Sequence, residues 1–99
     1  MALAAPALAL DRAQAEASAI SKAEWKSACG LSYWDCPWAQ INAANGPYSG
    51  TTQWEVIVTV FREHGSTAQY CAWNIPIKEN GDWAPGVYGG CRSASGGGG

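Results

Sequence analysis

The chain has 99 residues, of which only 14% are charged, and a formal net charge of −2 with a pI near 5.1. This length allows one small domain, and the acidic balance argues against a basic patch for nucleic-acid binding. The 12 glycines and 5 prolines favour turns and strands over long helices.

Residues 1–10 are apolar and rich in alanine. They resemble the end of the hydrophobic region of a secretory signal peptide, with Ala7-Leu8-Ala9 as a small-x-small cleavage pattern. A disordered alanine-rich tail is the alternative interpretation. The stretch therefore predicts secretion, and it is far too short to span a bilayer.

The segment 11–28 is expected to form one short helix. Asp11 can cap it, and Gln14 three residues later completes a capping box. A second capping box at Ser21 offers a later start, and Gly30 supplies a stop. The weakly apolar helix face would consist of Ala13, Ala17, Ile20 and either Ala23 or Glu24.

The stretch from Thr51 to Lys78 has the pattern of a β-hairpin. Two runs rich in β-branched and aromatic residues flank a short polar link that contains Gly65. Side chains alternate along a strand, so each run has one apolar face. The core predicted from these faces consists of Trp54, Val56, Val58, Val60, Cys71, Trp73, Ile75 and Ile77. Pro76 lacks an N–H, which places the second strand at a sheet edge or distorts it after Asn74.

The segments around the hairpin are less regular. Residues 31–34 could form a short strand, 35–37 a bend and 45–47 a strong turn, within a region that otherwise looks like a loop. After the hairpin, a turn is expected at 79–82 and a last, glycine-broken strand at 83–91.

The four cysteines indicate two disulfides, because an even number in a short chain of extracellular character is typical of a disulfide framework. A zinc site would need close cysteine pairs, and the single histidine is His64, so no metal is expected. Three pairings are possible. Cys71 on the apolar strand face could reach Cys91 on a later strand, which would leave Cys29 with Cys36 across a short loop.

The expected fold is mainly β: a small antiparallel, disulfide-bonded sandwich or sheet with one short N-terminal helix. In this interpretation residues 1–10 are a leader remnant or a disordered tail, and 11–28 are a helical segment. Residues 29–92 form the disulfide-bonded β domain, and 93–99 form a flexible glycine-rich tail.

A family resemblance is carried by Cys29-x-x-x-Tyr33 with the tryptophans after it, Ala44-Asn45-Gly46, the run Val56 to Val60, Tyr70-Cys71-Ala72, and Cys91. In these places the chain resembles the small secreted α-amylase inhibitors of streptomycetes, of the tendamistat type. The resemblance covers residues 29–91 and implies a secreted β-sandwich with a Cys71–Cys91 bridge. The Trp-Arg-Tyr triplet of that family is missing, because Trp34-Asp35-Cys36 or Trp38-Ala39-Gln40 stands in its place.

No catalytic motif is recognisable. Glu55, Arg62 and His64 could supply the acid–base set of a small ribonuclease, but strand alternation puts Glu55 and Arg62 on opposite faces. Glu55 and Glu63 would lie about 26 Å apart on one strand, too far for glycoside hydrolysis. We therefore expect a protein that is not an enzyme and needs no cofactor.

Aromatic side chains beside turns are typical of rigid binding anchors. The candidate binding residues are Tyr33, Trp34, Asp35, Trp38 and Trp83. The leading interpretation is a small secreted binding protein that inhibits a secreted hydrolase of the amylase type. The alternatives are a carbohydrate-binding module that binds polysaccharide with the same aromatics, and a small ribonuclease. A purely structural role is the remaining alternative, in which these rings close the open ends of a thin domain. An exposed edge strand would also permit self-association.

Overall fold

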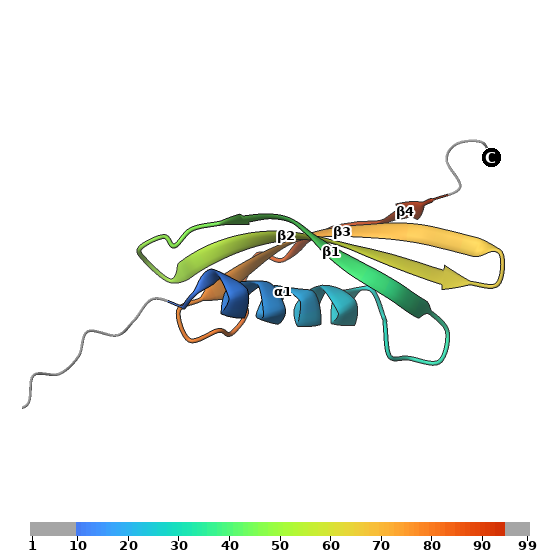
Figure 1. Cartoon of the computed structure of the whole chain (residues 1–99), viewed down its shortest axis with the longest axis horizontal. Helices are drawn as coiled ribbons and strands as arrows, with labels where there is room; N and C mark the ends of the chain where they lie inside the picture. Colours follow the sequence, from blue (N-terminus) through green and yellow to red (C-terminus); the bar gives the residue numbers. More distant parts are fainter. Residues whose placement is uncertain (1–9, 95–99) are drawn as a thin grey trace, which may run out of the picture.

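The computed structural model describes residues 10–94. Its elements are α1 (Arg12–Lys26), β1 (Asp35–Asn45), β2 (Thr52–His64), β3 (Thr67–Lys78) and β4 (Tyr88–Ser93). The strands form one antiparallel sheet in the order β1-β2-β3-β4, and α1 lies across one face of it (Figure 1). The expected mainly β, disulfide-bonded fold with an N-terminal helix is confirmed, in its single-sheet form. The expected leader cleavage pattern and glycine-rich tail lie largely outside the described residues.

Helix α1 starts at the first of the two expected caps. The Asp11 carboxylate accepts a hydrogen bond from the Gln14 amide at 2.8 Å, and the Gln14 side chain accepts one from the Asp11 amide at 3.2 Å. This reciprocal pair satisfies two amides that the helix cannot satisfy internally. The later start at Ser21 is therefore not used.

The helix ends earlier than expected. Ser27 is the C-cap, and Ala28 after it adopts a positive φ of 62°. The Ala28 amide donates to the Trp25 carbonyl at 3.0 Å and the Cys29 amide to the Glu24 carbonyl at 2.9 Å. These two bonds form a Schellman motif with Ala28 as its left-handed residue, so the stop predicted at Gly30 was wrong by two residues.

The helix presents a stripe of small residues to the sheet. Ala15, Ala19 and Ala23 are fully buried, four residues apart, whereas Ala13 and Ala17 are exposed. Of the predicted helix face, Ala23 is buried and Ile20 packs against the core, whereas the placement of Ala13 and Ala17 was wrong. Alanines line both faces of this helix, so hydrophobicity could not distinguish them. The consequence of the small stripe is a close approach of the helix to the strands.

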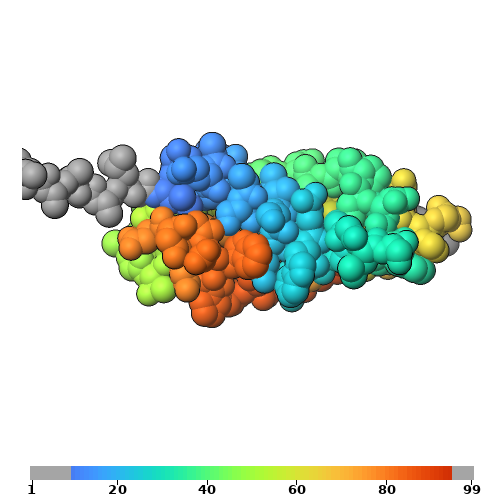
Figure 2. All heavy atoms as spheres, turned by 90° about the horizontal axis from the view of Figure 1, so that it is seen from below, coloured from blue at the N-terminus to red at the C-terminus, as the bar shows by residue number. Residues whose placement is uncertain are grey.

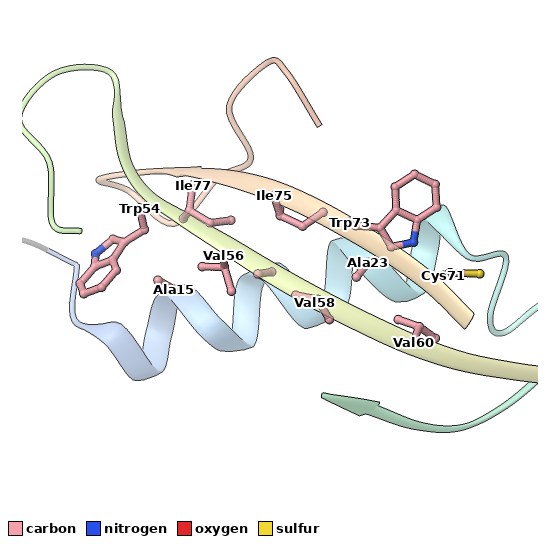
Figure 3. Close-up of a cluster of buried hydrophobic side chains, with 11 residues drawn as sticks. Ala15, Ala23, Trp54, Val56, Val58, Val60, Cys71, Trp73, Ile75 and Ile77 are labelled. Carbon is pink, nitrogen blue, oxygen red and sulfur yellow. The ribbon is translucent and has the colours of Figure 1, made fainter. Parts of the chain in front are cut away.

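The core lies between α1 and the sheet, as Figure 3 shows. All eight residues that strand alternation predicted are buried there: Trp54, Val56, Val58, Val60, Cys71, Trp73, Ile75 and Ile77. One face of the sheet is thus covered by the helix. Within residues 10–94 no element covers the opposite face, which we call the open face (Figure 1).

Strand β3 is an inner strand, so its predicted edge position was wrong. It pairs with β2 on one side and with β4 on the other. Pro76 is tolerated because β4 pairs with β3 only as far as Asn74. The Pro76 carbonyl accepts a hydrogen bond from the Ala84 amide, so it points away from β2. In an antiparallel strand the backbone nitrogen and the carbonyl of one residue point to the same side. The missing N–H therefore faces away from β2.

The edge strand β1 occupies the region before the hairpin that was expected to be a loop. The predictions of a short strand at 31–34 and of a bend at 35–37 were wrong. Ala39 and Ile41 pack against the core, and after an irregularity in register between Ile41 and Ala43 the core position moves to Ala44. Alanine is depleted in strands, and a bulge breaks the period of two, so the sequence pattern concealed this strand. Beyond Asn45 the chain reverses, as the turn signal predicted.

The last strand is shorter than expected. It begins at Tyr88, whereas Trp83 makes only an isolated bridge with Ile77. The disulfides join Cys29 with Cys36 and Cys71 with Cys91, which confirms the pairing favoured by proximity. The first ties the end of α1 to β1, and the second joins directly opposite residues of β3 and β4.

Candidate functional site

The five candidate binding residues do not share one surface. Tyr33, Trp34 and Asp35 lie where the link from α1 enters β1, Trp38 lies on the open face, and Trp83 lies beside α1. The candidate residues thus lie in three places, and each place has different chemistry.

The first place is a cluster of Tyr33, Trp34, Arg62 and His64, which we call the loop-end cluster. The Tyr33 and His64 rings stack with centroids 3.8 Å apart, and Trp34 meets both rings edge-on. His64 Nδ1 lies 2.8 Å from the Tyr33 carbonyl oxygen. A carbonyl can only accept, so Nδ1 is the protonated nitrogen. These contacts hold the disulfide-closed link against the end of β2.

Arg62 occupies the inner side of that cluster. It donates to the Ser27 carbonyl at 2.7 Å and to the Gln69 side-chain oxygen at 2.7 and 3.0 Å, and its guanidinium lies 4.1 Å from the Trp34 ring. Burial lowers the pKa of Arg62. Its hydrogen bonds go to acceptors within the fold, so Arg62 fastens the helix end to β2 and β3.

The acid–base set considered for a ribonuclease is not assembled. Glu55 is opposite Asn45 and Pro76, seven residues along β2 from Arg62, or about 23 Å at the usual rise. The single ion pair among residues 10–94 joins Arg12 and Glu16, so no carboxylate pairs with Arg62 or His64 there. The loop-end cluster therefore has the contacts of a structural fastening.

The second place is a row of aromatic side chains that crosses three strands of the open face: Trp38, Phe61 and Tyr70, here called the outer aromatic row. The sheet register sets Trp38 opposite Phe61 and Phe61 opposite Tyr70. The Trp38 and Phe61 rings are nearly parallel at 5.4 Å, and Tyr70 is tilted against Phe61 at the same separation. Trp38 is 42% exposed and Tyr70 37%.

Sequence reasoning missed Phe61 and Tyr70 as site residues. Alternation placed both opposite the apolar faces of the hairpin, which is where they lie. Without β1 in the sheet, however, nothing aligned Trp38 with them. The signal was present in the hairpin, but recognising the row required the register of the edge strand.

Next to this row the open face is hollowed. Ala72 lies opposite Gly90, and beyond these small residues stand Ile57, Asn74 and Tyr88. A shallow cavity of about 190 Å³ is lined by Ile57, Ala72, Trp73, Asn74, Tyr88 and Gly89. Tyr88 is 66% exposed, and its hydroxyl accepts a hydrogen bond from the Asn74 amide at 3.1 Å. The open face thus carries protruding aromatic side chains next to a shallow depression lined partly by small residues.

The third place surrounds Trp83, on the side of α1. Its indole Nε1 donates to the Ser18 carbonyl at 3.1 Å, and the Lys22 ammonium lies 4.2 Å from its ring. These contacts attach the β3–β4 connection to the helix.

Comparison with protein-family models, with curated proteins and with solved structures gives no match to this chain. Among residues 10–94 no helix has the length and apolar character needed to cross a bilayer. That same part of the chain contains no cluster of three or more histidine, cysteine or acidic residues that could hold a metal ion. Function must therefore be inferred from the surfaces themselves.

Proposed function

We propose that this chain is a secreted, non-enzymatic binding protein that engages a protein partner through the open face of its sheet. The observation that carries the proposal is the outer aromatic row, in which three rings from three strands meet on an uncovered face. Contiguous exposed apolar surface of this kind marks interaction sites.

The composition of the face supports a protein partner. Arg92 on β4 lies opposite Tyr70, so the row continues into an arginine. Tryptophan, tyrosine and arginine are the residues that dominate binding energy at protein interfaces. The rings project from paired strands, not from loops, which lowers the conformational entropy that binding would cost.

The two disulfides support the secreted part of the proposal, because disulfides persist mainly in oxidising compartments. The resemblance to tendamistat-type inhibitors makes a secreted hydrolase, with α-amylase first, the target to test. The inhibitory surface proposed here is the outer aromatic row, which differs from the triplet of that family.

The test is a titration of the chain against α-amylase and a panel of secreted glycosidases and proteases. We expect stoichiometric inhibition of one enzyme. Trp38→Ala and Tyr70→Ala should each weaken it at least tenfold, as loss of a central anchor does. Tyr48→Ala removes a ring of similar exposure in the β1–β2 link and serves as the matched control. Equal effects of Trp38→Ala and Tyr48→Ala would refute the assignment of the open face.

A second candidate function is carbohydrate binding, and the polar residues of the open face favour it. Gln40 and Asn42 are exposed beside the aromatic row, and the Thr59 hydroxyl donates to the Asn42 side-chain oxygen at 2.6 Å. Neutral amides and hydroxyls next to aromatic faces can bind sugar hydroxyls while the rings stack on the sugar. Retardation of the chain alone in gels that contain a neutral polysaccharide, abolished by Trp38→Ala, would favour this candidate over inhibition.

A further inference from the structure

A groove on the side of α1, remote from the open face, collects the positive charge of the chain. It is a cavity of about 390 Å³ between α1 and the connection from β3 to β4. The lysines Lys22, Lys26 and Lys78 line it, and they are all the lysines of the sequence. In Figure 2 the helix (blue to cyan) lies beside the orange segment of this connection.

These charges are not matched by acids of the fold. The ion pair of Arg12 with Glu16 is the single one among residues 10–94, so none of the three lysines has a carboxylate within 4.0 Å. Lys22 and Lys26 are one helical turn apart, where like charges disfavour the helix. The helix dipole favours a lysine in the last turn, which accounts for Lys26 but not for Lys78 on β3.

The acids nearest in sequence form no ion pair with these lysines. Glu24 lies between Lys22 and Lys26 along α1, where side chains two residues apart do not face each other. The Asp82 carboxylate accepts one hydrogen bond from the Asn80 side-chain amide, at 3.0 Å. Glu79 and Lys78 both line a second hollow, together with Gly50 and Thr51, but no ion pair joins the two side chains. A chain of net charge −2 therefore gathers at one groove three ammonium groups that form no ion pair within residues 10–94, and two of them, Lys22 and Lys26, lie over tryptophan rings. This is the pattern expected for recognition of an anion.

The other wall of the groove is apolar and firmly held. It is made by Trp83, Pro85 and Val87. The Trp83 indole is fixed by its bond to the Ser18 carbonyl and by the Lys22 ammonium, which lies 4.2 Å from both the Trp83 and Trp25 rings. Trp83 still exposes 41% of its surface. A ligand for this groove therefore needs an apolar face as well as negative charge.

We propose that this groove binds an acidic oligosaccharide, a chain of uronic-acid sugars. Each such sugar carries one carboxylate for the lysines and one C–H face that can lie against Trp83 and Pro85. Lysine ammonium groups act as point charges and do not impose the two-pronged geometry of arginine, which suits carboxylates spaced along a chain. The cavity volume lies within the range of about 300–1,000 Å³ typical of small-ligand sites. An acidic peptide matches the charge but lacks the flat C–H face.

The experiment is calorimetric titration of the whole chain with tri-galacturonate at low salt, next to its fully methyl-esterified form and hexa-glutamate. The methyl ester keeps the sugar rings and removes the charges, and the peptide keeps the charges and removes the rings. We expect tri-galacturonate to bind, the ester not to bind, and hexa-glutamate to bind at least fivefold more weakly. Raising the salt concentration should weaken binding, because exposed charges are screened.

The variants Lys26→Gln and Lys78→Gln should each weaken tri-galacturonate binding at least threefold, and together at least tenfold. Arg12→Gln removes one positive charge at the far end of the same helix and is the matched control, with an expected change below twofold. Trp38→Ala should leave this binding unchanged, which separates the groove from the open face. No binding at millimolar tri-galacturonate, equal binding of hexa-glutamate, or an Arg12→Gln effect as large as that of Lys78→Gln would overturn the proposal.

Discussion

The indole Nε1 of Trp73 donates a hydrogen bond to the hydroxyl of Ser27 at 2.9 Å, in the buried layer where the end of α1 meets β3. Ser27 is fully buried and caps the helix, and its carbonyl accepts a second bond from Arg62 at 2.7 Å. One serine thus connects the helix end to two neighbouring strands. The position of α1 on the sheet depends on polar contacts here, because the alanine stripe buries little area.

We predict that Ser27→Ala destabilises the fold by about 1–3 kcal/mol, because it leaves the indole N–H of Trp73 buried without an acceptor. Ser21→Ala, on the exposed side of the same helix, is the control and should change stability by less than about 0.5 kcal/mol. Urea unfolding followed by far-UV circular dichroism measures both. If the two variants unfold at the same urea concentration, the bond does not contribute as described.

Arg62→Lys should lower the free energy of unfolding by about 1–2 kcal/mol although the charge is kept. A single ammonium cannot reach the Ser27 carbonyl and the Gln69 side chain with the geometry of the guanidinium, nor stack equally well on Trp34. Arg92→Lys, at an exposed position of β4, should be nearly neutral. Unfolding of both variants in guanidinium chloride measures the two changes in the free energy of unfolding. An equal loss of stability in Arg92→Lys and Arg62→Lys would contradict the role assigned to Arg62.

The hairpin was predictable because its signal is redundant. Val56, Val58 and Val60 form a wholly apolar row, whereas the opposite face of the strand is mixed, and a slip of one residue would expose the whole row. The capping box at Asp11 was equally local, since the two residues that form it are three apart. In both cases the sequence contains the interacting partners within one short window.

Strand β1 and the outer aromatic row could not be predicted in the same way. The core positions of β1 are mostly alanine, and the bulge before Ala43 interrupts the alternation. Trp38 and Phe61 are 23 residues apart in the sequence, and their pairing depends on the irregular register between β1 and β2. The lysine groove likewise joins α1 to the end of β3, and no periodicity relates Lys22 to Lys78.

Ala28→Gly should stabilise the chain by about 0.5–1 kcal/mol. Ala28 has a positive φ of 62°, a conformation that costs a residue with a Cβ about 1–2 kcal/mol and glycine nothing, while glycine gains entropy in the unfolded chain. The same exchange at exposed Ala17 in mid-helix, Ala17→Gly, should destabilise by about 1 kcal/mol. Thermal unfolding of the pair therefore tests the sign at each position, and shifts in the same direction would show that the helix does not end at Ser27.

The two disulfides should differ in their contribution to stability. In the chain-entropy model a bridge stabilises by restricting the unfolded chain, and longer loops gain more. The Cys71–Cys91 bridge spans 20 residues and Cys29–Cys36 spans 7. Removing the first by a double alanine exchange should cost about 3 kcal/mol, and removing the second about 2.4 kcal/mol.

Packing increases this difference. Cys71 is fully buried in the core, so its replacement by alanine also removes core contacts, whereas Cys29 and Cys36 are only partly buried. The Tyr33–His64 stack and the Arg62 contact with Trp34 would still hold the link after loss of the Cys29–Cys36 bridge. Urea unfolding of the two double variants, with the remaining bridge verified by intact mass under non-reducing conditions, measures the order. A larger loss in the Cys29/Cys36 variant would mean that the link between α1 and β1, and not the β3–β4 pair, limits the stability of the fold.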